Sequence, residues 1–231
     1  MALGGWLLRI ADLSGASHLF LAFPCQDHCD IDLRQQPLIR DSNASTVVRM
    51  LESGHILKLV KPRTFHEYFK LFWNSSRVHK EVAGNRCLKQ LGMAVPALYC
   101  RGYGLLPAQK GGFLGFIRME NLAASGYADA REMMISGLLA GDARCRFLEK
   151  FCDDLLVMRQ HKIVFNDLKL GNTFADAAGN LAWIDTGITR YPAWQQGKFS
   201  KKYAFSLRRF FKRHETLLSV EERAYIRGRL S

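Results

Sequence analysis

Apolar and polar positions alternate through the first half of the chain, a pattern that predicts strands. Two apolar runs, Trp6–Ile10 and His18–Phe23, are separated by glycine and serine, so we expect an N-terminal hairpin. Residues 38–51 and 54–61 predict three antiparallel strands joined by short polar turns, the first turn at Asp41–Ser45. Two more strands are expected at Val95–Cys100 and Gly112–Glu120.

Helical spacing of apolar residues dominates the rest of the chain. The segment from Arg77 to Leu91 follows a serine cap at Ser75 or Ser76 and stops at Gly92. The longest periodic stretch runs from Asp142, which is expected to be its N-cap, to about Gln160. A basic amphipathic helix is expected over 198–213, and the capping box Ser219-x-x-Glu222 predicts a final helix.

Composition and charge narrow the possible classes of protein. With 48% hydrophobic and 23% charged residues, the 231-residue chain should be globular rather than disordered. No apolar run approaches the ~18 residues of a spanning helix, and Arg9 and Asp12 interrupt the N-terminal apolar stretch, so we expect no signal peptide. The net charge of +12 predicts an anionic partner without identifying it.

Six cysteines are scattered along the sequence without a disulfide framework, so we expect reduced, buried thiols. Cys25 and Cys29 flank His28 and resemble half of a zinc site. No second pair of ligands follows at a suitable spacing, and we therefore expect no zinc.

The segment Val164–Asp185 carries the strongest chemical signal. Asp167 precedes Asn172 by five positions, Asp185 follows thirteen later, and Lys169 lies two residues after Asp167. This is the layout of the kinase catalytic loop and the metal-binding aspartate. Transfer of a phosphoryl group needs a carboxylate at the acceptor hydroxyl, oxygen ligands for Mg²⁺ and a nearby cation. We expect Asp167 and Lys169 to be catalytic, and Asn172 and Asp185 to bind the metal.

Upstream residues have the types that would bind ATP. Lys58 ends an apolar run and is favoured over Lys61, which precedes Pro62, as the anchor of the phosphates; the choice stays open. Glu81, on the helix after Ser76, is expected to pair with that lysine. The turn at Asp41–Ser45 lacks glycine, but Ser45 is small enough to let the backbone approach a phosphate. The remaining candidates form a hinge for adenine at Met119, Glu120 and Asn121.

The order of these elements predicts an α+β, protein-kinase-like bilobal fold. We expect an N-terminal extension over 1–39 and a small antiparallel-sheet lobe with one helix over 40–120. A mainly helical lobe should follow over 121–231.

Within that fold, residues 40–231 resemble the bacterial lipopolysaccharide-core sugar kinases, the group that includes heptose and 3-deoxy-octulosonate kinases. The resemblance is carried by Lys58, by the helix with Glu81 leading into Gly92–Pro96, and by the segments 165–172 and 184–187. It departs from ordinary kinases at Phe165 and Asn166, where histidine and arginine are usual, and at Thr186, where phenylalanine is usual.

The resemblance implies an enzyme that uses ATP and Mg²⁺ to phosphorylate a sugar hydroxyl of an anionic glycolipid. It further implies a cytoplasmic protein, at the inner face of the inner membrane. The basic helix 198–213 is either a solvated face over a packed one or a docking surface for anionic lipid. We expect a monomer and no nucleic-acid partner. Two alternatives stay open: a compact protein serine/threonine kinase, and a pseudokinase or regulatory nucleotide-binding module.

Overall fold

The structure, a computed structural model, describes residues 6–23, 30–64, 66–72, 75–105 and 112–230. The chain divides into two compact units. Unit 1 comprises the described residues up to Ala83 together with Pro96–Asn121, and unit 2 comprises Gly84–Val95 and the described residues from Leu122 onward. The segment Cys25–Cys29, which contains His28 and was considered above for zinc, lies outside the described residues.

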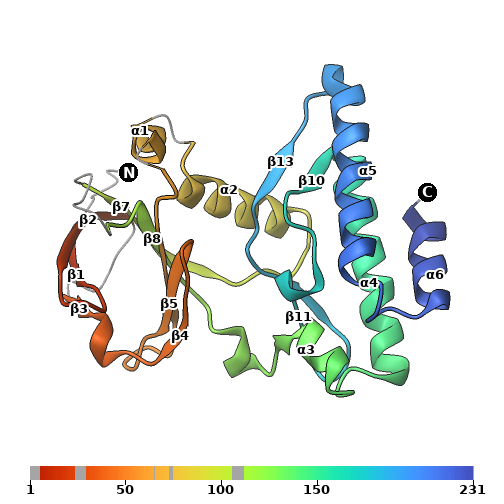
Figure 1. Cartoon of the computed structure of the whole chain (residues 1–231), viewed down its shortest axis with the longest axis horizontal. Coiled ribbons are helices and arrows are strands. Elements are labelled where there is room, and N and C mark those ends of the chain that lie inside the picture. Colours follow the sequence, from red (N-terminus) through yellow and green to blue (C-terminus); the bar gives the residue numbers. More distant parts are fainter. Residues whose placement is uncertain (1–5, 24–29, 65, 73–74, 106–111, 231) are drawn as a thin grey trace. The chain divides into compact units, whose positions relative to one another are not determined.

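Unit 1 is built on an eight-stranded sheet in the order β3-β1-β2-β7-β8-β6-β5-β4, curled into a half-barrel (Figure 1). Neighbouring strands pair antiparallel except β1 and β3, which are parallel, so the sheet is mixed. The strands are β1 (Trp6–Ala11), β2 (Ser17–Phe23), β3 (Ile31–Asp32), β4 (Leu38–Asp41), β5 (Ser45–Arg49), β6 (Ile56–Val60), β7 (Leu98–Gly104) and β8 (Gly115–Met119).

The prediction of a protein-kinase-like bilobal fold is wrong. The main feature is this single mixed sheet, which runs from Trp6 to Met119, rather than a small antiparallel lobe beside a helical one. Seven of its eight strands were predicted, including the N-terminal hairpin, and β3 was missed. Their partners were not, because β2 pairs with β7 and makes residues 6–23 part of the same sheet.

Alternating burial explains how the sheet curls around an apolar interior. In β2, Phe20 and Ala22 are fully buried while their neighbours are partly or fully exposed. The Phe20 ring meets Phe116 of β8 edge to face, with centroids 5.4 Å apart. Burial of such side chains contributes about 25 cal/mol per Å² of apolar surface, and this favours the curled form of the sheet.

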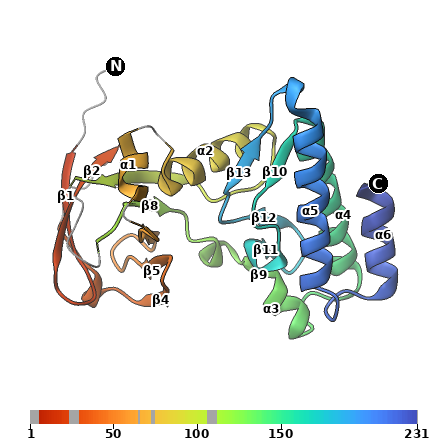
Figure 2. The same cartoon turned by 45° about the horizontal axis from the view of Figure 1, so that its top comes forward.

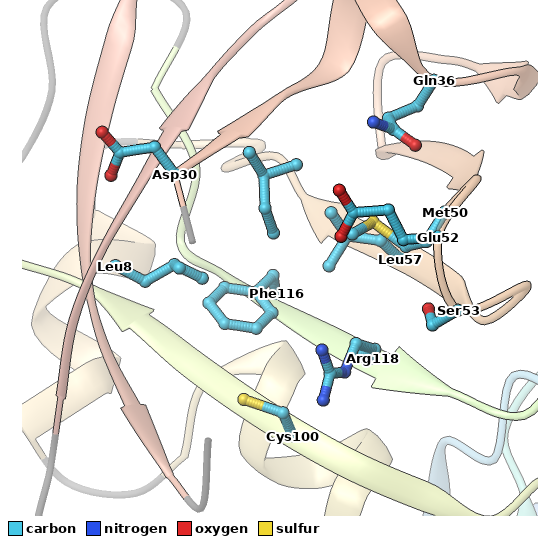
Figure 3. Close-up of a pocket in the computed structure, with 11 residues that line it drawn as sticks. Leu8, Asp30, Gln36, Met50, Glu52, Ser53, Leu57, Cys100, Phe116 and Arg118 are labelled. Atoms are coloured by element: carbon cyan, nitrogen blue, oxygen red, sulfur yellow. The ribbon is translucent and has the colours of Figure 1, made fainter. Parts of the chain in front are cut away.

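A small cavity lies among the strands of unit 1 (Figure 3). Apolar side chains of Leu8, Leu57 and Phe116 line it, and the Arg118 guanidinium and Glu52 carboxylate face the same space. Its volume is about 80 Å³, whereas pockets for drug-sized ligands measure roughly 300–1,000 Å³. The cavity is therefore too small for a nucleotide, and no site residue predicted above is among its described lining residues.

Two helices accompany the sheet, α1 (His66–Phe72) and α2 (Arg77–Gln90). The predicted cap of α2 is present, since Ser76 Oγ accepts a hydrogen bond from His79 N–H. The helix stops as predicted at Gly92, which has φ +80°, and Met93 N–H returns to the Leu88 carbonyl. The first residues of α2 belong to unit 1 and its last residues to unit 2.

Unit 2 contains four helices and two small sheets (Figure 2). Its sheets have the orders β10-β13 and β12-β11-β9, so the expectation of a mainly helical lobe missed them. The elements are β9 (Ala128–Asp129), α3 (Ala130–Ile135), α4 (Gly141–Gln160), β10 (Ile163–Phe165), β11 (Thr173–Ala175), β12 (Leu181–Trp183), β13 (Ile188–Arg190), α5 (Gln196–Arg213) and α6 (Val220–Leu230).

Helix α4 supplies the centre of the unit 2 core through Phe147, Phe151, Leu155 and Met158. Its cap is Ala140, two residues before the predicted Asp142, which lies in the first turn instead. Asp142 still suits that place, because a carboxylate near a helix N-terminus is favourable.

The predicted capping box of α6 is confirmed. Glu222 N–H donates to Ser219 Oγ at 3.1 Å, and Ser219 N–H donates to the Glu222 carboxylate at 2.8 Å. The same carboxylate accepts hydrogen bonds from Arg144 of α4, which joins the two helices.

Four described cysteines are free thiols, as predicted: Cys87, Cys100, Cys145 and Cys152. Cys100 and Cys152 are buried as expected, but Cys87 is only partly buried and Cys145 is exposed, so the expectation is wrong for these two. No helix within the described ranges is both long and apolar enough to cross a bilayer.

Candidate active site

The segment around Asp167 leaves a two-stranded sheet of unit 2. Strands β10 and β13 pair antiparallel with Phe165 opposite Ile188. Directly beyond this pair, Asn166 N–H donates to the Gly187 carbonyl at 3.0 Å. The loop that carries Asp167 and the loop that carries Asp185 therefore leave the same strands side by side.

The Asp167 carboxylate is held by one cation on each oxygen. Lys169 Nζ donates to Oδ2 at 2.6 Å, and Arg213 Nη1 donates to Oδ1 at 2.7 Å. The Asp167 side chain is 44% exposed, so solvent or a ligand can still reach it. The sequence predicted Lys169 here but not Arg213.

These contacts keep Asp167 ionised. Burial alone raises the pKa of Asp167, but the hydrogen bonds and charges of Lys169 and Arg213 outweigh it and lower this pKa to about 2. At neutral pH the carboxylate therefore accepts hydrogen bonds and donates none.

Asn172 lies behind the loop and is 3% exposed. Its Nδ2 donates to the Asp167 backbone carbonyl at 2.9 Å, and this bond fixes the amide so that Oδ1 faces away from that carbonyl. The hairpin β11–β12 pairs Thr173 with Trp183, and Ile184 N–H donates to the Asn172 carbonyl. The register thus brings Asn172 opposite the residue before Asp185.

Asn172 and Asp185 fit a Mg²⁺ ion, which prefers oxygen ligands and is usually bound by one or two carboxylates with water and phosphate oxygens. The amide orientation described above directs a neutral oxygen of Asn172 away from the loop, and Asp185 is exposed. Within the part of the chain that the structure describes, no cluster of three His, Cys, Asp or Glu side chains could hold a metal.

Asp185 has an unusual backbone, with φ +54°. Left-handed geometry is costly for most residues but tolerated by aspartate, and such outliers concentrate at functional loops. The loop is further shaped by Gly84 of α2, because a Cβ there would lie 1.7 Å from the Thr186 carbonyl oxygen. Only glycine at position 84 lets the helix approach the loop this closely.

Helix α5 and its C-cap residue contact the Asp167 loop through three side chains. Ser206 Oγ donates to the Phe165 carbonyl at 3.0 Å, and Leu170 N–H donates to His214 Nε2 at 3.1 Å. Arg213 provides the third contact, to Asp167 itself. Sequence reasoning missed all three, although Arg213 was counted in the basic cluster; a contact spanning more than forty residues leaves no local pattern.

His214 is 4% exposed and accepts a backbone hydrogen bond, so it is neutral. Burial is the main cause that lowers the pKa of His214, to about 4, and the charges of Arg131 and Arg213 lower it further. Protonation would place a second donor against Leu170 N–H and break this contact.

In unit 1, the predicted contact between Lys58 and Glu81 is present. Lys58 Nζ lies 2.7 Å from Glu81 Oε1, and the two side chains are only 13% and 16% exposed. Lys61, the competing candidate, instead pairs with Asp41 at 2.6 Å. This geometry favours Lys58 for the role that the sequence left open.

The remaining predicted residues lie in a turn and at a strand end of unit 1, where they make contacts with the backbone. Ser45 is buried, and its N–H donates to Ser42 Oγ within the turn. Glu120, which follows Met119 at the end of β8, uses its N–H and its carboxylate on Ala97. Asn121 is partly buried and follows directly. These residues hold the turn and the strand end in place.

The structure thus brings together Asp167, Lys169, Asn172 and Asp185 within unit 2, and Lys58 with Glu81 within unit 1. No protein-family model matches this chain. No curated protein matches it either.

Proposed function

We propose that this protein is a kinase that uses ATP and Mg²⁺ to phosphorylate a sugar hydroxyl, of heptose or 3-deoxy-octulosonate, in the lipopolysaccharide core. The observation that carries the proposal is the Asp167 carboxylate. It is ionised, partly exposed and held by Lys169, beside a hairpin that places Asn172 and Asp185 in adjacent register. Those are the residue types and spacing that phosphoryl transfer to a hydroxyl requires.

Asp167 would orient the acceptor hydroxyl by accepting its hydrogen bond. A carboxylate with a pKa of about 2 is a weak base. Its contribution is therefore mainly orientation, with the proton passing to it as the new oxygen–phosphorus bond forms. Lys169 lies beside this carboxylate and would offer its ammonium group to the charge of the moving phosphoryl group.

Asn172 and Asp185 would hold Mg²⁺, which when bound neutralises charge on the nucleotide phosphates. In unit 1, Lys58 is the candidate for binding an anionic phosphate group. Both Lys58 and Glu81 are mostly buried, and the hydrogen bond between them holds the Lys58 Nζ in place.

An anionic glycolipid acceptor fits the surface of α5. Between Gln196 and Arg213 this helix has no acidic residue, and its exposed positions carry Lys198, Lys201, Lys202, Arg208, Arg209 and Lys212. Phe205 lies in the middle of this basic face and is 44% exposed, with Lys202 Nζ 5.5 Å from its ring centre. Exposed aromatic and basic side chains together favour the interface of an acidic membrane. We therefore propose a cytoplasmic protein that works at the inner face of the inner membrane.

The test is mass spectrometry of core oligosaccharide from cells that carry the wild-type chain, Asp167→Ala or Glu149→Ala. Glu149 is an exposed carboxylate on α4 and serves as the matched control. We expect one phosphate to be missing with Asp167→Ala alone. An unchanged core with Asp167→Ala would reject the proposal.

The same variants separate the alternatives. A protein kinase would lose phosphate from protein targets and leave the core intact. A nucleotide-binding module without catalysis would bind ATP equally well in the wild type and both variants, and would show no loss of phosphate from either kind of target.

A further inference from the structure

We infer that Arg213 is a positioning residue for the proposed reaction. From the end of α5 it holds one oxygen of Asp167 while Lys169 holds the other, and so it fixes the plane of the carboxylate that meets the acceptor hydroxyl. The inference rests on the proposed function and adds to it a residue from outside the loop.

Two donors on two oxygens fix a carboxylate in a way that one donor cannot. An ionised carboxylate offers about four lone-pair positions, and a single contact leaves it free to rotate about its last torsion. Lys169 and Arg213 occupy one position on each oxygen of Asp167. The remaining positions keep a set direction, and because the side chain is 44% exposed, an acceptor hydroxyl can use one of them.

Arg213 is itself held in place by its neighbours. The next residue, His214, is buried, packs against the Phe210 ring and accepts the Leu170 N–H. Seven residues before Arg213, Ser206 Oγ donates a hydrogen bond to the Phe165 carbonyl. The end of α5 is therefore bonded to the loop both before and after Asp167, at Phe165 and at Leu170. These contacts fix the backbone from which the Arg213 side chain extends.

The ion pair between Arg213 and Asp167 is too exposed to add much stability, which indicates a role in positioning. The side chains of Arg213 and Asp167 are 37% and 44% exposed, and pairs this open contribute little to stability. Loss of Arg213 should therefore leave folding almost unchanged, whereas small errors of orientation cost about a hundredfold in rate. An effect on rate without an effect on folding separates positioning from a structural role.

The activity test compares Arg213→Gln, Arg213→Lys and Arg229→Gln. Arg229 forms a similarly exposed pair with Asp153 between α6 and α4, so it is a matched control. The assay follows transfer of radioactive phosphate from ATP to dephosphorylated lipopolysaccharide. We expect Arg213→Gln to lower kcat about tenfold to a hundredfold with KM for ATP unchanged. Arg213→Lys should recover part of the rate, and Arg229→Gln should behave as wild type, all with the same unfolding midpoint.

A second measurement does not depend on activity. Nitrogen-detected NMR of the arginine side chains should show separate Nη signals for Arg213, because the pair with Asp167 slows rotation of the guanidinium. These signals should merge in Asp167→Asn, while those of Arg229 stay unchanged.

The outcomes are distinct. Averaged Arg213 signals in the wild type, or wild-type kcat with Arg213→Gln in an active enzyme, overturn the inference and leave the proposed function standing. Separate Arg213 signals in a wild type that transfers no phosphate reject the proposed function, and the catalytic role of Arg213 with it.

Discussion

His214 is a buried neutral imidazole that ties α5 to the loop of Asp167, and it should make stability depend on pH. The pKa of His214 is lowered from 6.5 to about 4 in the folded chain, mainly by burial. Between these values the unfolded chain binds a proton that the folded chain does not, so stability falls as pH falls from 6.5 towards 4. We expect a loss of about 2 kcal/mol between pH 7 and pH 5.

Urea unfolding at the two pH values measures this loss. In His214→Gln the amide oxygen can still accept the Leu170 N–H but does not titrate, so the pH dependence should flatten. His161→Gln, at the exposed end of α4, is the control and should keep the wild-type dependence. A wild-type slope in His214→Gln would show that other groups dominate.

Substitution of Gly84 tests whether α2 must pack closely against the Asp185 loop. A methyl group at this position would meet the Thr186 carbonyl oxygen at 1.7 Å, and because this atom is backbone, the loop must move. We expect Gly84→Ala to cost about 1–3 kcal/mol in unfolding free energy. Gly228→Ala, on open α6, should be neutral or stabilising by up to about 1 kcal/mol. Equal effects of the two substitutions would contradict the close approach.

At the residue scale, the sequence predicted those site residues that a motif or a short pattern connects. Asp167, Lys169 and Asn172 lie within six positions of one another, and the hairpin to Asp185 is short. Lys58 was predicted because it ends the apolar run Ile56–Leu57, and Glu81 because it lies in the first half of the predicted helix. The sequence did not predict Arg213, His214 or Gly84, because their partners lie far away in the sequence and their roles depend on tertiary packing.

At the scale of elements, α5 has two faces that do different things. Its buried face carries Phe199, Tyr203 and Phe210, while the opposite face is basic with Phe205 at its centre. A helix that only covered a core would need no exposed phenylalanine among its cations. This face is the one we propose for the acidic membrane.

Vesicle binding tests that face. Replacing Lys201, Lys202 and Arg209 with glutamate should weaken binding to phosphatidylglycerol vesicles by over a hundredfold. Each basic residue near an acidic surface contributes about 1 kcal/mol to membrane binding. Binding should also fall with salt. The matched reversal changes three exposed basic residues of α2, Lys80, Arg86 and Lys89, and should have a smaller effect. Equal losses would assign binding to net charge alone.

The elements themselves were largely predictable, because alternation and caps are local. The capping box of α6 and the stop of α2 at Gly92 were correct. The N-cap of α4 was misplaced by two positions, since an aspartate is equally favourable in the first turn. The short strands β3, β9, β11 and β13 were missed, because three residues or fewer carry no usable periodicity.

At the scale of the whole molecule, the predicted fold failed at the pairing of strands. Pattern and turns identified β1 and β2 as a hairpin but carried no signal for which strand lies next to it. The pairing of Phe20 with Gly104 joins the N-terminal hairpin to β7, and β3 adds a parallel edge. Partner choice is settled by the shared apolar interior around Phe116, which no local window contains.

The pairing of β2 with β7 has a consequence for how the chain is made. On the ribosome the hairpin β1–β2 emerges before the rest of the sheet, yet β7, which pairs with β2, follows only after β3 to β6, α1 and α2 have been synthesised. Until then one rim of the hairpin has unsatisfied backbone groups, the kind of edge that invites pairing with another chain. The nascent protein is therefore most vulnerable to aggregation early in synthesis, and completion of β7 ends that interval.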